Sequence, residues 1–463
     1  MKSVQSKGQM GWISLALMTI VAIDSLRALP IGAMYGTSIV VYYLFLGLCF
    51  FIPSALVCAE LASCWPESGG LYVWIKQAFG LRCATVAIWC QWFYNVVWFP
   101  SICIFLATTL CYVINPNIVA HRFTLLLLST LLFMLATFLN SFGVKVNSIV
   151  SNITAWLGSL LPILFIIALA YGWYHLHKPM AISFHAVDFL PKLNHISDLS
   201  ILTGLVFGLF GMEVTAVHAG DVKKPQRNFP RALTFATIVI LLTQMGGALA
   251  IAMVIPKDQL HLAASLMDAY VYFLRAFHIE FLSKWIAVAI FLGGLGGMSV
   301  WMLAPARGMM IAAQDGIIPQ SLCKQNAHGA PIRLFIIQSI AFVVLSSCFA
   351  FFDFNQAYWL LSALTAQMAI IVYLLIFAAA IKLRFSAKER PRKFAVPGGS
   401  FGMVLVSGLG IVSLLIVMGF GFMAPADFHY QHPALFSIGL VLTLLLLVSV
   451  ALFLPCRDKV IKS

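Results

Sequence analysis

The segment GLVFGLFGME, residues 204–213, interrupts an apolar run with three glycines and ends on a carboxylate. Glycine weakens a helix, and a charged side chain inside the apolar part of a bilayer is costly and usually functional. A second segment, AIDSLRALP at residues 22–30, places Asp24, Arg27 and a proline inside the first apolar run of the chain. Proline removes a backbone donor and interrupts a helix. Both segments therefore predict membrane helices that break near their middle.

The composition requires a membrane as the main solvent. Of the 463 residues, 62% are hydrophobic and only 9% are charged, whereas a soluble globular domain carries about 25% charged residues. So few charges cannot solvate a folded surface in water. This excludes a cytosolic enzyme, a disulfide-rich secreted domain and a disordered chain.

Apolar runs long enough to cross a bilayer recur along the whole chain. A spanning helix needs about 20 mostly apolar residues. We expect twelve such helices, at residues 11–37, 39–62, 83–114, 122–140, 148–175, 199–220, 231–256, 282–313, 332–352, 357–381, 402–424 and 433–455.

The distribution of positive charge predicts the orientation. Most of the 28 lysines and arginines fall in loops on the same side as the N-terminus, and the densest group lies at 382–393. Cytoplasmic loops carry such an excess, so both termini are expected in the cytoplasm. The net charge of +13 follows from this bias and does not indicate nucleic-acid binding. A lipid-binding basic motif is the alternative interpretation of 382–393.

Asp24 and Glu213 lie at similar depths in the first and sixth runs, five helices apart. Because five is odd, a second copy of the first five helices runs upside down. We therefore expect an all-α membrane protein with a five-plus-five inverted repeat and broken helices 1 and 6. The expected units are residues 1–197, 198–390 and, for two trailing helices, 391–463. Taken alone, the glycines of helix 6 would also suit close helix packing.

Matching broken helices in inverted repeats indicate a transport site at the bilayer midplane. The amino ends of half-helices hold a carboxylate, and unwound carbonyls hold a cation or an ammonium group. An α-amino acid offers both groups. The sequence therefore favours an amino acid as the substrate.

Several spaced motifs resemble the amino acid–polyamine–organocation transporters. They are GMEVTAVHAGD at 211–221 followed by KKPQRNFP at 223–230, AELA at 59–62 and PESGGLY at 66–72. Three further motifs resemble the glutamate/γ-aminobutyrate antiporter branch of that superfamily, namely AMVIP at 252–256, PARGM at 305–309 and VPGG at 396–399.

The resemblance implies a LeuT-like fold and alternating access of an amino acid, often by exchange, in the bacterial inner membrane. It also implies the site. Substrate contacts are expected at Ala22, Ile23, Asp24, Ser25, Phe207, Gly211, Met212 and Trp301. Tyr94 and Trp98 of helix 3 are the candidates, with Arg27, for a gate or brace.

Individual residues keep alternative interpretations. Glu213 is the candidate proton-responsive group, and a permanent partner of Arg27 or a helix cap is the alternative. Asp24 and Arg27 stand three residues apart and can pair on one helical face. Trp301 also suits plain packing. Tyr358 and Trp359 are expected as interfacial anchors near the outer membrane face.

Other classes of function lack their signatures. An intramembrane enzyme would show a motif such as HExxH or GxSxG. HExxH does not occur, and GxSxG matches only GGSFG at 398–402, in the loop before the eleventh apolar run. We expect no enzyme activity, cofactor or metal. The preferred function is an inner-membrane amino acid antiporter, acting as a monomer or homodimer in the bilayer. The alternatives are a proton-coupled amino acid symporter and a non-transporting amino acid receptor of the same fold.

Overall fold

The computed structural model describes residues 10–66, 69–142, 156–191, 195–216, 222–316, 322, 324–327, 329–392, 394–428 and 430–453. Within these residues the regular structure is helical, apart from isolated bridges between Met10 and Val222 and between Gln325 and Pro331. The α-helices are α1 Trp12–Ile23, α2 Leu29–Ala33, α3 Ile39–Leu46, α4 Ile52–Cys64, α5 Leu71–Phe79, α6 Leu81–Ile114, α7 Arg122–Ser141, α9 Leu161–His175, α10 Leu202–Phe207, α11 Pro225–Val254, α12 Ser265–Ala276, α13 Leu282–Gln314, α14 Ile332–Ser346, α15 Cys348–Phe351, α16 Phe354–Ser386, α17 Gly399–Gly421 and α18 Pro433–Phe453.

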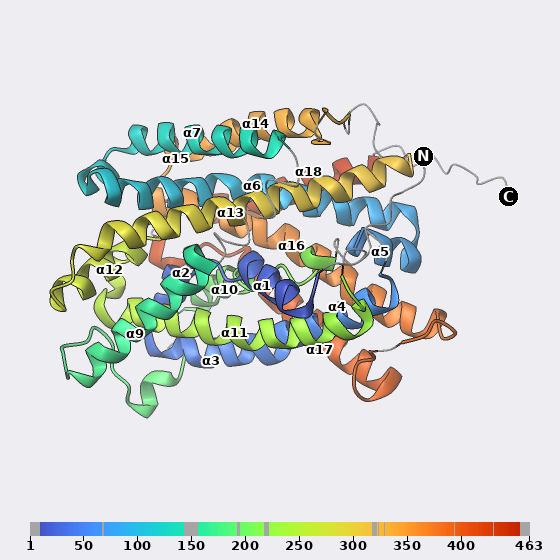
Figure 1. The fold of residues 1–463 in the computed structure, drawn as a ribbon, viewed down its shortest axis with the longest axis horizontal. Coiled ribbons are helices and arrows are strands. Elements are labelled where there is room, and N and C mark those ends of the chain that lie inside the picture. The colour runs from blue at the N-terminus through green and yellow to red at the C-terminus, as the bar shows by residue number, and fades with distance from the viewer. Residues whose placement is uncertain are drawn as a thin grey trace.

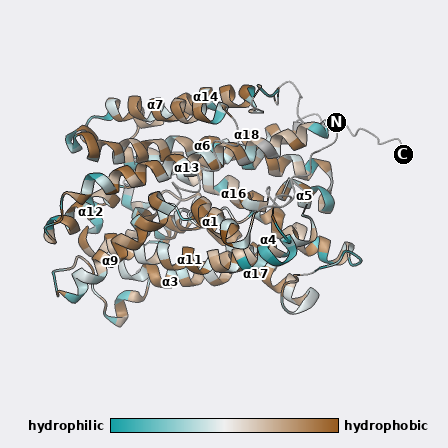
Figure 2. Cartoon of the chain, viewed as in Figure 1, coloured by the Kyte–Doolittle hydropathy of each residue, from teal (hydrophilic) through white to brown (hydrophobic). Residues whose placement is uncertain are grey.

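Most of these helices belong to membrane spans. In the described part of the chain, 11 helical segments are long and apolar enough to cross a bilayer. The sixth expected run differs, because its helix, Ile196–Phe207, is too short to cross and then unwinds. Figure 2 shows hydrophobic residues along most of the long helices. The expected fold class, an all-α membrane protein with interrupted first and sixth segments, is confirmed.

The long helices run roughly along the longest axis of the molecule (Figure 1). Helix α6 packs against α13 and α16, and α1 packs against α11. Helices α1 and α10 lie near the centre of the view, α5 lies at one end of the bundle and α12 at the other. We call these the α5 end and the α12 end. The interrupted segments are therefore enclosed by longer, continuous helices.

Local sequence explains both interruptions. Helix α1 stops at Ile23, two non-helical residues follow, and helix resumes at Leu26 with a proline at the start of α2. Helix α10 stops at Phe207, and Gly211 beyond it has φ +131°. Only glycine adopts that conformation without strain. A Cβ on Gly211 would also lie 2.8 Å from Ile23 Cγ1 and 3.1 Å from Trp301 Cζ2. The two breaks thus meet at a glycine.

Candidate functional site

The break in the first span forms one wall of the candidate site. The amide of Asp24 donates to the Ile20 carbonyl at 2.6 Å, which ends α1, and Ser25 has an extended backbone with φ −92° and ψ 115°. The amide of Ala28 then donates to the Ser25 carbonyl at 2.9 Å. A short polar segment therefore separates two helical pieces inside the bundle.

A cavity of about 40 Å³ lies against this segment. Its lining includes eight residues that the sequence proposed for the site, namely Ala22, Ile23, Ser25, Arg27, Tyr94, Trp98, Phe207 and Trp301. Ala28, Asn95, Gly208 and Phe210 complete the wall. Helices α1, α6, α10 and α13 thus bring these side chains together, although they lie far apart in the sequence.

Trp301 is held firmly in the cavity wall. Its indole Nε1 donates to the Ala22 carbonyl at 2.8 Å. Its ring centroid lies 6.1 Å from that of Tyr94 and 6.1 Å from that of Trp98. The side chain is 8% exposed. Trp301 therefore ties α13 directly to the break in the first span, which plain packing would not require.

Glu213 is fully buried beyond the break in the sixth segment. Its carboxylate accepts hydrogen bonds from the hydroxyls of Tyr373 and Tyr94, the latter at 3.1 Å, and from Gln91 Nε2 at 3.5 Å. The Tyr373 hydroxyl also accepts from the amides of Gly211 at 2.8 Å and Met212 at 3.1 Å. Glu213 therefore organises the unwound segment through Tyr373, and it has no cationic partner among the described residues.

Asp24 is also fully buried, but it faces helix α11. It accepts from Thr243 Oγ1 at 2.8 Å and from Gln244 Nε2 at 2.7 Å. Gln244 in turn accepts from the Tyr43 hydroxyl at 3.4 Å. Asp24 therefore joins the first, second and seventh spans through neutral donors. It does not line the first cavity, but it borders a second space of about 40 Å³, which Arg27, Trp98 and Trp301 also line.

The Arg27 side chain contacts α6 and α16 instead of α11. Its Nη1 donates to Ser101 Oγ at 3.2 Å and to Ser362 Oγ at 3.3 Å. The guanidinium carbon lies 4.8 Å from the ring centroid of Phe207 and 5.3 Å from that of Tyr358. Across the described chain, no ion pair joins Arg27 to Asp24 or to Glu213. The expected Asp24–Arg27 brace is therefore absent, because the helix is interrupted between the two residues and their side chains bind different helices.

The placement of Tyr358 and Trp359 corrects another expectation. Both side chains are fully buried, whereas interfacial anchors would be exposed to the lipid headgroups. Tyr358 packs on Arg27. A Cβ placed on Gly204 would lie only 2.8 Å from Cζ3 of the Trp359 ring, so Trp359 packs directly on that glycine. They begin α16, but neighbouring helices cover them completely. Met212, expected at the site, is buried but does not line the cavity.

Several polar partners of the site have no signal in the sequence. Tyr373, Gln91, Thr243 and Gln244 lie inside long apolar helices. Only the approach of their helices to the two breaks selects them. To find them, one must know which helices contact each other in the fold.

Ion pairs close the α5 end of the bundle. Glu60 accepts from Arg384 Nη1 at 2.8 Å and from Arg392 Nε at 3.1 Å, and the Val396 amide donates to it at 2.6 Å. Part of the basic group at 382–393 is therefore docked on α4 and is not free to contact lipid.

A second contact at the α5 end joins α5 to the end of α13. The Lys76 Nζ and the Tyr72 hydroxyl each lie 2.6 Å from Asp315 Oδ2. Partial burial of Asp315 opposes its ionisation, but these hydrogen bonds outweigh it and hold the pKa of Asp315 below its usual range. The Asp315 carboxylate is therefore ionised at neutral pH.

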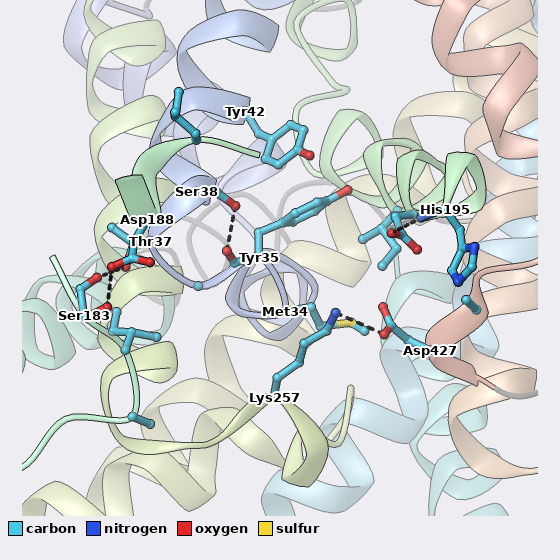
Figure 3. Close-up of a pocket in the computed structure, with 17 residues that line it drawn as sticks. Met34, Tyr35, Thr37, Ser38, Tyr42, Ser183, Asp188, His195, Lys257 and Asp427 are labelled. Carbon is cyan, nitrogen blue, oxygen red and sulfur yellow. Dashed lines mark hydrogen bonds and ion pairs between the residues drawn. The ribbon is translucent and has the colours of Figure 1, made fainter. Parts of the chain in front are cut away.

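A larger cavity of about 460 Å³ opens at the α12 end. Figure 3 shows Lys257 and Asp427 reaching toward one another, 3.0 Å apart, below the ring of Tyr35 in this view. Burial, then the nearby Tyr42, Asp427 and Asp198, raise the pKa of Tyr35. Each carboxylate that lines this cavity has a hydrogen-bonded or ionic partner. Within the described residues, no group of three metal-ligating side chains gathers anywhere.

Comparisons with known proteins agree with the geometry. The family model for amino acid permeases matches residues 10–448. An uncharacterized transporter of Legionella pneumophila is 44% identical over 98% of both chains. A glutamate/γ-aminobutyrate antiporter of Lactococcus lactis is 28% identical over 84% of this chain and 78% of its own. The solved structure of a manganese transporter from Eremococcus coleocola has a TM-score of 0.59 at 13% identity, covering 95% of this chain and 94% of the other. That likeness concerns the fold alone.

Proposed function

The chain belongs to the amino acid permease family, within the amino acid–polyamine–organocation superfamily, and on that premise we propose that it exchanges amino acids across the membrane. It is a multi-pass membrane transporter. The antiporter of Lactococcus lactis, at 28% identity, supports exchange and makes glutamate and γ-aminobutyrate the first substrates to test.

One observation carries the proposal, namely that the two interrupted segments meet at a cavity in the middle of the bundle. Interrupted helices leave backbone groups free to bind the charged ends of a small zwitterion. In this proposal, Ala22, Ile23, Ser25 and Phe207 contact the substrate, and Trp301 covers it. Gly211 permits the close approach of Ile23 and Trp301.

Alternating access would follow from movement of the interrupted helices against α6 and α13. We place the α5 end in the cytoplasm, because the basic group at 382–393 belongs to this end and loops rich in lysine and arginine stay on the cytoplasmic side of a membrane. The repeats would be residues 1–197 and 198–390, followed by the trailing segment 391–463. A bacterial inner membrane with both termini in the cytoplasm completes this proposal.

Glu213 is our proposed proton-responsive group. It is buried, has only neutral partners, and contacts Tyr94 of the cavity wall. A change in its charge would alter the hydrogen bonds of Tyr373, which holds the amides of Gly211 and Met212. Protonation of Glu213 would therefore change the hydrogen bonds that hold the unwound backbone at Gly211 and Met212.

Proton symport and amino acid sensing without transport are the rival functions. Counterflow in proteoliposomes separates them. For exchange, radiolabelled amino acid enters rapidly only when the vesicles contain unlabelled amino acid. Uptake that needs a proton gradient and ignores the internal amino acid would support symport. Binding without any uptake would support a receptor.

A matched pair of tryptophan variants ties the activity to the site. Trp301→Leu removes the cover and its hydrogen bond to Ala22, so exchange should fall at least about tenfold. Trp285 lies on the same helix α13 but is 72% exposed, and Trp285→Leu should leave exchange unchanged. Equal effects of both variants would contradict the proposed site.

A further inference from the structure

Arg27 is a buried cation that forms no ion pair with a described carboxylate. Its side chain is 2% exposed, and its described polar contacts are the hydroxyls of Ser101 and Ser362. Its Nε has no hydrogen-bond partner. Removing a charge from water costs several kcal/mol unless it is paired and fully hydrogen-bonded. The contacts seen here offset only part of that cost.

The nearby carboxylates do not supply the missing charge. Asp24 faces Thr243 and Gln244 on α11. Glu213 is held by Tyr373, by the hydroxyl of Tyr94 and by Gln91. The other described residues that line the first cavity with Arg27 are all neutral. No described carboxylate forms an ion pair with Arg27, so an anion that enters the cavity can supply the compensating charge.

Arg27 lies where such an anion would arrive. It lines the cavity beside the break, together with Ser25, Trp98 and Trp301. A guanidinium group binds a carboxylate through two parallel hydrogen bonds, which adds geometric selectivity to the charge attraction. The rings of Phe207 and Tyr358 hold it without competing for those hydrogen bonds.

We infer that the substrate is an amino acid with a carboxylate in its side chain, and that Arg27 pairs with this second carboxylate. The inference rests on the proposed function. A zwitterion has a single carboxylate, and if the free backbone groups of the breaks bind it, as proposed above, Arg27 stays unpaired. A dicarboxylic amino acid carries one net negative charge at neutral pH and neutralises Arg27 on binding.

The cavity must widen to admit this substrate. At about 40 Å³ it is close to the volume of one water molecule, about 30 Å³. Trp98 and Trp301 both line it and pack against each other, with ring centroids 6.1 Å apart. Entry of an amino acid therefore requires these rings to separate. Tryptophan fluorescence should report that separation.

The test uses the purified full-length protein with four probes, L-glutamate, L-aspartate and their neutral isosteres L-glutamine and L-asparagine. Binding is followed by tryptophan fluorescence, and exchange by counterflow in proteoliposomes. The wild-type protein should prefer each dicarboxylate over its amide by roughly 10- to 100-fold. Arg27→Gln should lower that preference to within about threefold, mainly by weakening the dicarboxylates. Arg27→Lys should restore it in part, because charge returns without the two-pronged geometry.

Arg122→Gln is the matched control, because Arg122 lies exposed at the start of α7, where it donates to the Ala350 carbonyl at 3.3 Å. It should keep the wild-type preference. If the wild-type protein exchanges glutamine as well as glutamate, this inference is wrong, whether or not the Arg27 variants fold, while the proposed exchange stands. If no amino acid is exchanged, the proposed function and this inference both fail.

Discussion

Asp24 and Arg27 lie three residues apart in the first membrane segment, but their side chains bind different neighbouring helices. The Asp24 carboxylate accepts from Gln244 on α11 at 2.7 Å, whereas Arg27 donates to Ser101 on α6 at 3.2 Å. The non-helical residues 24–25 make this divergence possible. One break thus connects a carboxylate to the seventh span and a cation to the third. The consequence is that these two opposite charges form no ion pair with each other inside the bundle.

Gly211→Ala should destabilise the protein. The alanine would have to adopt a φ of +131°, and its Cβ would lie 2.8 Å from Ile23 Cγ1. We expect a loss of about 1–3 kcal/mol and strongly reduced exchange. Thermal unfolding in detergent measures the first effect and counterflow the second.

The matched control is Gly408→Ala in α17, where a Cβ would meet nothing within 4 Å. It should be neutral or stabilise the helix by up to about 1 kcal/mol. If both alanine variants behave alike, close contact at the break does not constrain the site.

Glu213→Gln should flatten the pH dependence of exchange. The amide keeps the shape of the side chain but cannot change charge between pH 5 and 8. Initial rates of counterflow should then vary less than about twofold across this range. Glu280→Gln, at an exposed position, should retain the wild-type profile. A Glu213→Gln profile that follows the wild type would remove Glu213 from proton coupling.

Glu60→Gln should lower the free energy of unfolding by removing the ion pairs at the α5 end. The carboxylate binds Arg384 and Arg392, and its side chain is 3% exposed. Removing one member of a buried ionic group leaves the other charges uncompensated, so we expect a loss of about 3 kcal/mol. Thermal unfolding should show it.

Glu389→Gln serves as the control for this cluster, because Glu389 is exposed in the same basic region. It should change stability by less than about 0.5 kcal/mol. A neutral result for Glu60→Gln would mean that water, and not Glu60, compensates the two arginines.

The Lys76–Asp315 contact should persist to mildly acidic pH. Because the pKa of Asp315 is below its usual range, its ion pair stabilises the folded protein above the unfolded pKa of about 4 and is lost as pH falls through the lower folded value. The stability difference between wild type and Asp315→Asn should be constant from pH 5 to 8 and shrink only below about pH 4. Asp258→Asn, at an exposed site, should show little difference. A difference that shrinks above pH 5 would contradict this assignment.

The sequence predicted the membrane spans and both interruptions well, because hydropathy and helix-breaking residues act locally. Asp24, Arg27 and Glu213 were also visible, since charges are rare in apolar runs. Their partners were not. Tyr373 and Gln244 sit in long apolar helices and gain meaning only where those helices approach the breaks.

Periodicity also gave a wrong result at one point. A spacing of three residues places Asp24 and Arg27 on one helical face, and the helix stops between them. In the same way, Tyr358 begins a span near its end yet is fully buried against Arg27. Position along a helix predicts depth in the membrane, but coverage by neighbouring helices depends on the tertiary fold.

A cryo-electron microscopy structure of the full-length protein in lipid nanodiscs, with saturating L-glutamate, tests the midplane site most directly. We predict ligand density between Ser25, Arg27 and Trp301, with both membrane segments interrupted at residues 24–25 and beyond 207. Density only in the cavity beside Tyr35 and Asp427, or unbroken helices through both segments, would contradict it.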